Sequence, residues 1–440
     1  MRHCTAGPRE RIKRGVTPPR PRGIAALTAL VAAAVLLLGA CDRLVTVEAP
    51  SRVIADGLDI PSNADLLANS VGADFECAFA QYVVAQGLVG NELEVATGLI
   101  VMKEYDRRDF KSFGSSYSLN TCSSVFDVGV YKPLSTARWD ADHLVSLLQK
   151  WTDAEVPNRT SLLASSALYG GYSLVLLGES MCTAAIDLGP ELTAAQLFQA
   201  AETRFATAIS AAQTSGNTSA LNAALVGRAR ARHRQGKLAE AAADARQVPD
   251  GFVFNATYST ETPRRENGVW TRNYRDQNFT IDPSYRNLTY NGMPDPRVRL
   301  VNTGKLAAGD GRTPLWQQTK YPTISSPMPL ASWREAQLIV AEATGGQTAV
   351  DIINKLHATA GLPPFASSDS AAIRNQLMYE RKVELFLESH GLGDIRQYTL
   401  PLTPAPGVVF KDGSGTYAAQ TCFPLPDIER LNNPNIPKGP

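Results

Sequence analysis

The segment SALNAALVGRARARHRQGKLAEAAADARQ (residues 219–247) decides the fold class of this chain. Small and apolar residues recur at three- and four-residue spacing on both sides of the turn at residues 235–237, which predicts two short helices. Gly236 in the turn and Pro249 after the second run predict a tight hairpin of helices at 219–234 and 238–247. Such a hairpin cannot bury its apolar faces alone, so further helices are expected beside it.

The residues at the expected helix crossing are small. Ala229 and Ala241 stand where the two helices approach closely, and this pattern resembles the tetratricopeptide motif. The match is partial, because the signature tryptophan is missing and an arginine takes the place of an apolar residue. Four alternating arginines are expected to lie on a solvated helix surface; they are Arg228, Arg230, Arg232 and Arg234.

Helical periodicity extends on both sides of this hairpin. A buried helix is expected at 161–181 and an amphipathic helix at 193–213, with Thr193 as its N-cap. Residues 250–330 lose this periodicity and form a long irregular excursion with a few short strands, and excursions of this length are usually functional or disordered. Helices are expected again over the ranges 332–344, 348–361 and 370–389. We therefore expect a mainly α fold with long irregular insertions.

The N-terminus has the organisation of an export signal. Residues 2–22 carry seven basic residues and one acid, and an Ala/Leu/Val run follows at 24–38. Leu38-Gly39-Ala40-Cys41 resembles a bacterial lipobox, in which the cysteine is lipidated and becomes the first mature residue. We expect a signal peptide at 1–40, a lipidated tether at 41–60 and one domain at 61–440. An ordinary signal peptide with a chance cysteine is the alternative.

The exported part is mildly acidic. The whole chain has 43 Lys and Arg against 42 Asp and Glu, and removal of residues 1–40 leaves 36 against 41. This balance gives no electrostatic reason to expect a nucleic acid or an anionic lipid as partner.

Four cysteines remain in the mature chain besides Cys41, and an even number in an exported chain suggests two disulfides. Four cysteines allow three pairings, of which we favour Cys77 with Cys122 and Cys182 with Cys422. The wide cysteine spacing and the scattered histidines argue against a metal site, and no cofactor is expected.

Several stretches together resemble the SusD/RagB family of outer-membrane nutrient-binding lipoproteins. The segment 334–343 is similar to the family's R-x-A-E-x-x-L-I-x-A-E-A helix, and 380–396 to its E-R-x-x-E-L-x-x-E-G-x-R-x-x-D-L-R signature. Asp295-Pro296-Arg297 corresponds to a D-P-R motif, and 423–435 to a terminal F-P-I-P-x-x-E-x-x-x-N-P segment. The E-G-x-R of the signature is Glu388-Ser389-His390-Gly391 here, and the chain is short for the family.

The resemblance implies a non-catalytic, lipid-anchored protein at the outer membrane and the cell surface. Helical pairs at about 161–249 and 331–390 would form a scaffold against a TonB-dependent, SusC-like transporter. The excursion at about 250–330 would face a glycan or peptide ligand, with an oligosaccharide favoured. Asp42 is compatible with surface export in this group and with inner-membrane retention in other bacteria.

The excursion combines aromatic and polar residues, as a sugar-binding site requires, because sugar rings stack on aromatic faces while their hydroxyls bond polar groups. The expected ligand-binding residues are Trp270, Tyr274, Tyr285, Tyr290 and Trp316, although each ring could instead pack the excursion onto the helices. Trp139, Trp151 and Trp333 fall within helical patterns and are expected in the core.

Two other functions compete with nutrient binding. A tetratricopeptide-type scaffold lipoprotein would organise envelope proteins without a small ligand. A surface hydrolase would use carboxylates such as Glu380, Glu384 and Glu388, which lie on one helix face. Like charges at this spacing repel unless they are partnered, so we expect structural ion pairs with Arg381, Arg396 or Arg334 and no catalytic residue. Asp394 with Arg396 is expected to brace the following loop.

Overall fold

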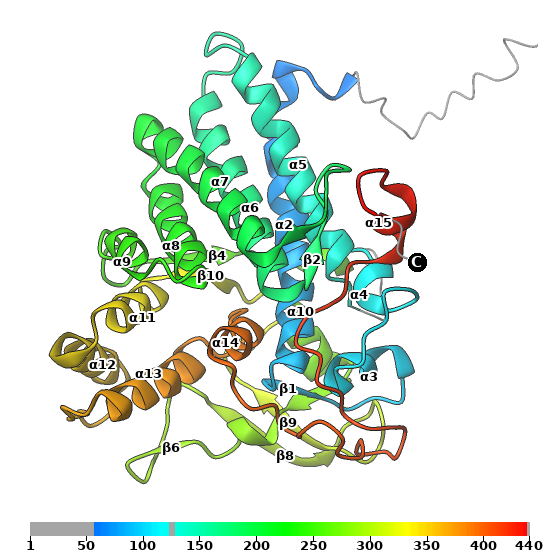
Figure 1. The fold of residues 1–440 in the computed structure, drawn as a ribbon, viewed down its shortest axis with the longest axis vertical. Helices are drawn as coiled ribbons and strands as arrows, with labels where there is room; N and C mark the ends of the chain where they lie inside the picture. The colour runs from blue at the N-terminus through cyan, green and yellow to red at the C-terminus, as the bar shows by residue number, and fades with distance from the viewer. Residues whose placement is uncertain (1–56, 123–127, 438–440) are drawn as a thin grey trace, which may run out of the picture. The chain divides into compact units, whose positions relative to one another are not determined.

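The structure is a computed structural model that describes residues 57–122 and 128–437. The expected signal peptide at 1–40, the lipidated Cys41 and most of the 41–60 tether lie outside the described residues. Residues 59–437 belong to one compact unit, in which the helices pack side by side above a set of short strands (Figure 1).

The N-terminal part of this unit is helical, with boundaries that the sequence pattern does not define. Its helices are α2 (Ala64–Val89), α3 (Ile100–Arg107), α4 (Ser116–Leu119) and α5 (Tyr131–Lys150). The second half of α2 is buried on every side, so it lacks the polar stripe by which an amphipathic helix is recognised in a sequence.

The central helices confirm the predicted hairpins. They are α6 (Arg159–Ser180), α7 (Ala194–Ser215), α8 (Thr218–Arg234) and α9 (Leu238–Ala245). Thr193 and Gln196 form a reciprocal capping box at the start of α7, as the sequence predicts for Thr193. α6 is apolar and long enough to cross a membrane, but most of its apolar stretch is buried against its neighbours α5 and α7, as in a core helix.

A second group of helices follows the excursion. It contains α11 (Trp333–Thr344), α12 (Gly346–Ala360), α13 (Ser370–Glu384), α14 (Gly391–Tyr398) and α15 (Asp427–Asn432). α13 ends earlier than the predicted 389, because Leu387 and Ser389 adopt left-handed backbone conformations with φ of 56° and 75°. α14 is a helix that the sequence analysis missed.

The excursion is folded into two-stranded antiparallel pairs. β4 (Val253–Ala256) pairs with β10 (Met328–Ser332), which brings the two ends of the excursion together. β1 (Leu93–Val95) pairs with β5 (Phe279–Ile281) in the register Leu93 to Ile281, and β8 (Leu300–Leu306) pairs with β9 (Pro314–Gln318). Smaller pairs join β2 (Thr183–Ala184) to β3 (Leu192–Thr193) and β6 (Thr289–Tyr290) to β7 (Met293–Pro294).

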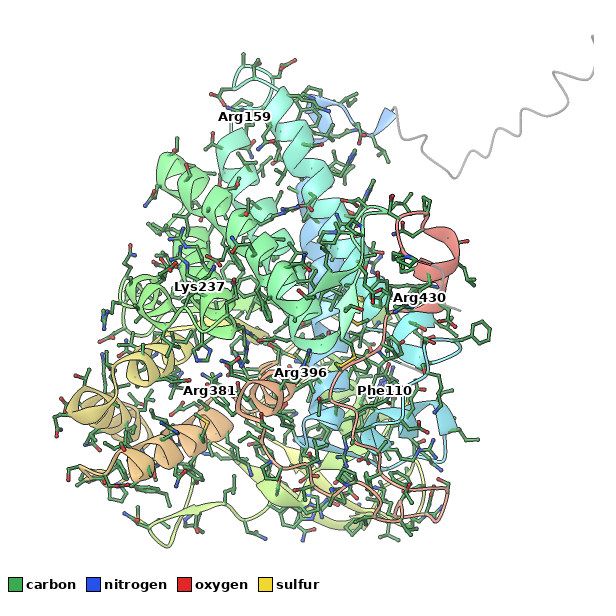
Figure 2. The ribbon with its side chains drawn as sticks, viewed as in Figure 1. Phe110, Arg159, Lys237, Arg381, Arg396 and Arg430 are labelled. Atoms are coloured by element: carbon green, nitrogen blue, oxygen red, sulfur yellow. A yellow bond between two sulfur atoms is a disulfide. The ribbon has the colours of Figure 1, made fainter. Side chains whose placement is uncertain are left out.

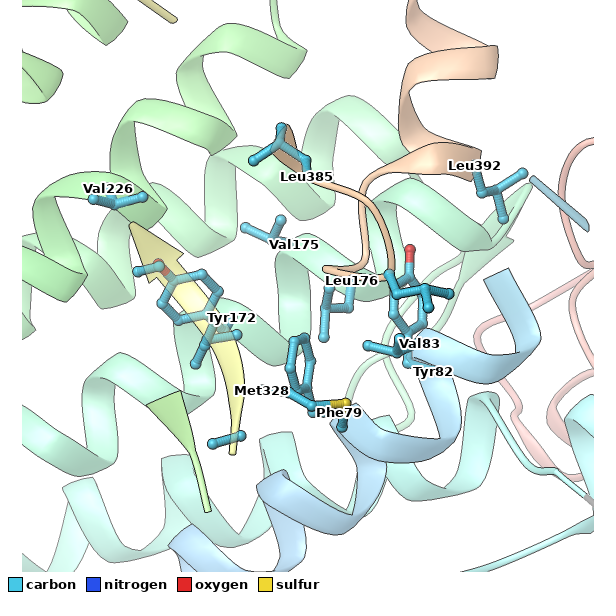
Figure 3. Close-up of a cluster of buried hydrophobic side chains, with 14 of the residues drawn as sticks. Phe79, Tyr82, Val83, Tyr172, Val175, Leu176, Val226, Met328, Leu385 and Leu392 are labelled. Atoms are coloured by element: carbon cyan, nitrogen blue, oxygen red, sulfur yellow. The ribbon is translucent and has the colours of Figure 1, made fainter. Parts of the chain in front are cut away.

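The hydrophobic core lies where α2, α6, α8 and β10 meet. Phe79 and Tyr82 of α2, Tyr172 of α6 and Met328 of β10 all belong to this cluster, in which Met328 lies beside Phe79 (Figure 3). A Cβ at Gly227 of α8 would stand 2.4 Å from the ring of a phenylalanine on α7, so only glycine allows this close approach of helices.

The tryptophans do not all follow the sequence prediction. Trp333 is buried as expected, but Trp139 is 50% exposed and its ring stacks on that of His143 at 4.8 Å. The prediction of a core position was wrong for Trp139. The buried face of α5 includes Ala137 and Ala141, and position 139 lies outside this face.

The solvated position predicted for the four arginines of α8 is wrong for Arg230 and Arg234. Their side chains are only 2% and 3% exposed, because other elements cover α8 on most sides. Both bind Glu179 of α6, whose oxygens lie 2.6 Å from Nη2 of Arg230 and 2.7 Å from Nε of Arg234. The remaining two arginines, Arg228 and Arg232, are partly buried and both bind Asp244 of α9.

These ion pairs extend into a network that joins four helices. We call Glu179, Arg230, Arg234, Arg381 and Asp394 the central ion network. Nη2 of Arg234 lies 2.9 Å from Oδ1 of Asp394, and Nη2 of Arg381 lies 2.7 Å from the same oxygen. Burial opposes ionisation of Asp394, but the charges of Arg381 and Arg234 outweigh it and lower its pKa to about 2. The sequence prediction paired Asp394 with Arg396 instead, and that pairing is wrong.

The structure pairs Cys77 with Cys122 and Cys182 with Cys422, the pairing that the sequence analysis favoured. The first bridge ties α2 to the loop before α5. The second crosses 240 residues and holds the C-terminal segment beside the end of α6. There the backbone N–H of Cys182 donates to the carbonyl of Phe423 at 2.8 Å.

Candidate functional site

The predicted ligand-binding aromatics fall into three places in the structure. Trp270 and Tyr274 are partly exposed and lie on one helical segment, with ring centroids 5.9 Å apart and planes within 8°. Trp316 is partly exposed on β9, where the guanidinium of Arg286 lies 5.6 Å from its ring centre. The remaining two tyrosines are buried.

Tyr285 and Tyr290 pack the excursion onto the second group of helices, and Tyr285 also lines a cavity of about 330 Å³. Tyr285 is 5% exposed and stacks on Phe386, with the ammonium of Lys382 4.4 Å from its ring centre. Tyr290 is 8% exposed, and its ring meets that of His357 edge-on at 4.5 Å. The packing alternative considered for each ring applies to these two.

The segment that carries Trp270 and Tyr274 has an unusual helical geometry. α10 (Gly268–Trp270) continues directly into a π-helical turn, η4 (Thr271–Arg275). Asn267 begins it: its side-chain oxygen accepts from the N–H of Trp270 at 3.0 Å, and its amide group donates to the carbonyl of Ser326 at 2.7 Å. π-helical turns recur at functional sites.

Buried hydrogen bonds hold this turn against β9. Asn273 is fully buried, and its side-chain amide donates to the carbonyl of Trp316 at 3.0 Å while its oxygen accepts from the N–H of Gln318 at 3.0 Å. The hydroxyl of Tyr274 donates to the carbonyl of Gln318. These hydrogen bonds fix the backbone that carries the aromatic pair, so the pair is preorganised for a ligand.

A cavity of about 310 Å³ lies on another face of the same segment. Thr271, Arg272 and Arg275 line it, together with residues 262–264, Glu266 and the Cys77–Cys122 disulfide. Trp270 and Tyr274 are not among its lining residues. The segment therefore presents an aromatic face on one side and a polar cavity wall on the other.

The charged groups at this wall are held in place by one another. Nη1 of Arg275 donates to both carboxylate oxygens of Glu266 at 2.9 and 2.8 Å, and its Nε lies 3.0 Å from Oδ1 of Asp276. The side chain of Arg275 remains 43% exposed. Such fixed donors and acceptors suit the hydroxyl groups of a sugar.

The sequence pattern indicated polar residues around the aromatics only in general, and Arg264, Glu266 and Arg275 were not identified as parts of a cavity. The spacing of positions 268, 271, 272 and 275 could have indicated a shared helix face. The contribution of the disulfide could not be found this way, because Cys77 is distant in the chain.

The glutamates at the end of α13 and Glu388 just after it form structural ion pairs, as predicted. Arg297 of the Asp-Pro-Arg motif binds Glu380 and lies 3.1 Å from Glu384, while Arg334 lies 3.1 Å from the other oxygen of Glu384. Glu388 pairs with Lys320 at 2.6 Å. Arg334 was among the predicted partners, whereas Arg297 and Lys320 were not. These carboxylates are bound by basic partners, and none of them lines the cavity beside η4, as an acid and base pair for hydrolysis there would.

Among residues 57–122 and 128–437, no group of three or more His, Cys, Asp or Glu side chains is arranged to hold a metal ion. Two histidines have lowered pKa values. Burial lowers the pKa of His233, and burial together with the charge of Arg230 lowers the pKa of His390 well below its usual value. Both occupy packed positions between helices.

Comparisons with known proteins agree with this fold. Residues 335–424 match the model of the SusD family. A SusD superfamily protein from Bacteroides fragilis is 12% identical with a TM-score of 0.63, over 86% of this chain and 99% of that chain. A SusD superfamily protein from Bacteroides vulgatus is 14% identical with a TM-score of 0.62, over 86% and 98%.

A SusD-like carbohydrate binding protein from Bacteroides fragilis is 16% identical with a TM-score of 0.54, over 85% of this chain and 98% of that chain. No curated protein matches the sequence significantly. At these identities the structural likeness establishes the fold.

Proposed function

We propose that this chain, which has the SusD fold and matches the SusD family over residues 335–424, is a non-catalytic lipoprotein that binds an oligosaccharide. It delivers this nutrient to a TonB-dependent, SusC-like transporter of the outer membrane. The observation that carries the proposal is the partly exposed, near-parallel pair of Trp270 and Tyr274 on the rigid π-helical turn.

The aromatic pair suits the apolar face of a sugar ring. Two ring planes within 8° of each other offer flat surfaces in the same orientation, so a pyranose ring can stack without distortion of the protein. The base of the pair is fixed by Asn273, which reduces the entropy lost when a ligand is ordered on it. An aromatic anchor of this kind commonly contributes about 2 kcal/mol or more to binding.

The polar groups on the cavity side of the same segment suit sugar hydroxyls. Arg275, Glu266 and Asp276 offer charged donors and acceptors whose positions are set by their mutual ion pairs. Charge-assisted hydrogen bonds to such groups are stronger than those between neutral partners. The segment thus offers a stacking surface on one face and directional hydrogen bonds on the other, two kinds of contact that an oligosaccharide uses.

The lipid anchor at Cys41, the outer-membrane location and the transporter belong to the same proposal. They are supported by the lipobox-like sequence at residues 38–41 and by the fold. Cys41→Ala should move the protein from the membrane fraction to the soluble fraction. Retention in the membrane fraction would show that another segment anchors the chain.

A glycan array probed with the purified mature protein tests ligand binding. Trp270→Ala should weaken binding of any glycan that the parent protein retains by roughly 30-fold, the equivalent of about 2 kcal/mol. Trp139→Ala is the matched control, because Trp139 is also exposed but lies on α5 outside the site, and binding should not change.

The alternatives predict different results. Equal binding by the parent protein and Trp270→Ala would remove the aromatic pair from the site. Failure to bind any glycan or peptide, together with capture of envelope proteins, would favour the scaffold. Release of shortened glycans by the purified protein would favour a hydrolase.

A further inference from the structure

A second, smaller pocket lies at the edge of the central ion network, between the end of α6 and α14. Its volume is about 180 Å³, and Glu179, Arg234, Gly393 and Arg396 line it beside Phe198 in the first turns of α7. Arg396 projects from α14 near the end of α6 (Figure 2). None of these residues belongs to the candidate glycan site.

We propose that this pocket binds a small oxyanion, a group with the chemistry of a carboxylate, phosphate or sulfate. Two guanidinium groups, those of Arg234 and Arg396, line the pocket, whereas Glu179 is the single carboxylate among its lining residues. Asp394 also pairs with Arg234 behind the wall, so the positive charge without a carboxylate partner is that of Arg396, and an anion is the ligand that compensates it.

Glu179 is not available to balance both arginines of the pocket. Its Oε2 accepts from Nη2 of Arg230 at 2.6 Å, and its Oε1 accepts from Nε of Arg230 at 2.9 Å and from Nε of Arg234 at 2.7 Å. Its side chain is fully buried, so its charge is already shared between two guanidiniums. Arg396 has no carboxylate partner in the part of the chain that the structure describes.

Arg234 retains an unused donor. Its side chain is 3% exposed, with Nε on Glu179 and Nη2 on Asp394 at 2.9 Å, but its Nη1 has no hydrogen-bond partner among the described residues. A buried donor without a partner costs free energy, and this guanidinium adds positive charge beside the pocket.

Hydrogen bonds hold the guanidinium of Arg396 at the wall of the same pocket. Its Nη1 donates to the carbonyls of Gly178, Glu179 and Met181 at 3.2, 2.7 and 3.1 Å, which caps the C-terminal end of α6. Only Nη1 of this guanidinium is engaged among the described residues, so its other nitrogens remain as donors for an oxyanion.

The pocket has room and a favourable field for such a group. Its volume far exceeds the roughly 10–15 Å³ that one water molecule needs, so a four-oxygen anion fits. Ala194 at the first position of α7 also lines it, and the N-terminus of this 22-residue helix attracts negative charge. A Cβ at Gly393 would lie 2.5 Å from Nη2 of Arg234, so glycine is what allows α14 to close this wall.

Isothermal titration of the purified protein with sodium phosphate, sodium sulfate and sodium acetate tests the proposal, with sodium chloride at equal ionic strength as reference. We expect saturable one-to-one binding of at least one oxyanion and a rise in melting temperature that chloride does not produce. Preference for phosphate or sulfate would indicate a phosphorylated or sulfated source, and preference for acetate a carboxylate such as a sugar acid. The absence of saturable binding by all three would overturn the proposal.

Variants locate the binding. Arg396→Gln should weaken the binding of the preferred anion roughly tenfold or more, because it removes a charged donor. Arg396→Lys keeps the positive charge but loses the forked pair of guanidinium donors. Its affinity for the anion should therefore lie between that of the parent and that of Arg396→Gln. Arg430→Gln, a surface arginine that pairs with Glu191, is the matched control and should bind as the parent does. Unchanged affinity in a folded Arg396→Gln would overturn the assignment to this pocket, and circular dichroism checks the fold.

Discussion

Replacement of Arg230 by methionine tests the central ion network most directly. The guanidinium binds both oxygens of Glu179 at 2.6 and 2.9 Å and the carbonyl of Ser389 at 2.7 Å, and its side chain is 2% exposed. Arg230→Met keeps most of the side-chain volume but removes all these bonds. Glu179 is then left buried with one guanidinium partner instead of two.

The expected loss is large because the charge left behind stays buried. Removal of one partner from a buried ion pair typically destabilises a protein by about 3–5 kcal/mol, which is a large part of a total stability of about 5–15 kcal/mol. With a urea m-value of about 3 kcal/mol/M, the unfolding midpoint should fall by about 1–1.7 M. Urea unfolding followed by circular dichroism, with the disulfides intact, measures this shift.

The control is an arginine of the same charge in an exposed pair. Arg430 is 38% exposed and lies 3.0 Å from Glu191, so Arg430→Met should lose no more than about 1 kcal/mol. The reasoning is refuted if Arg230→Met loses as little as Arg430→Met. That result would indicate that Arg230 lies on a solvated helix surface, as its alternation with three other arginines in the sequence suggests.

Three further perturbations test other parts of the fold. Burial raises the pKa of Asp106 to about 7, so its proton stabilises the fold at low pH and this contribution is lost between about pH 4 and 7. As the pH rises from about 4 to 7, the free energy of unfolding of Asp106→Asn should therefore increase by about 4 kcal/mol relative to that of the parent. Urea unfolding at a series of pH values measures this difference. The disulfide of Cys182 spans 240 residues and that of Cys77 spans 45, so Cys182→Ser should destabilise by about 1.5 kcal/mol more than Cys77→Ser in the same assay. Gly227→Ala should lower the free energy of unfolding by about 1–3 kcal/mol, because its Cβ would lie 2.4 Å from an aromatic ring. Gly72→Ala in α2 is the control: its Cβ would lie 3.6 Å from the nearest atom, so the change should be neutral or stabilising. Calorimetry measures both effects.

The parts of the fold that the sequence predicts are those that short-range chemistry determines. Thr193 caps α7 through Gln196, three residues away, and Gly236 has the positive φ of 74° that the turn of the α8–α9 hairpin requires. Both signals lie within a few residues of the structure they produce. The length of α6 follows equally from its continuous apolar sequence.

The parts that the sequence did not predict depend on distant segments. Arg230 is buried because Glu179 and Ser389, 51 and 159 residues away in the chain, enclose it. The candidate site shows the same division. Irregular backbone was expected over residues 250–330, so the helical turn that pairs Trp270 with Tyr274 was not predicted, and nothing local to Tyr285 reveals that Phe386 covers it.

The departure from the family signature at Ser389 shows how the central ion network supports an unfavourable backbone. The motif that residues 380–396 resemble has glycine at this position, and Ser389 adopts a φ of 75°, a conformation that usually favours glycine. For a residue with a side chain, such a conformation costs on the order of 1–3 kcal/mol. Ser389 is fully buried, so the surrounding structure must supply compensation.

Arg230 supplies that compensation. Its Nη2 donates to the carbonyl of Ser389 at 2.7 Å, and both Nη1 and Nη2 lie 3.3 Å from the serine Oγ, an acceptor that glycine does not have. Hydrogen bonds to a charged group contribute about 1.5–3 kcal/mol each, which is the same size as the backbone strain. The serine is therefore tolerated because α8 places an arginine beside it, and the buried arginine and the departure from the signature are two parts of one arrangement.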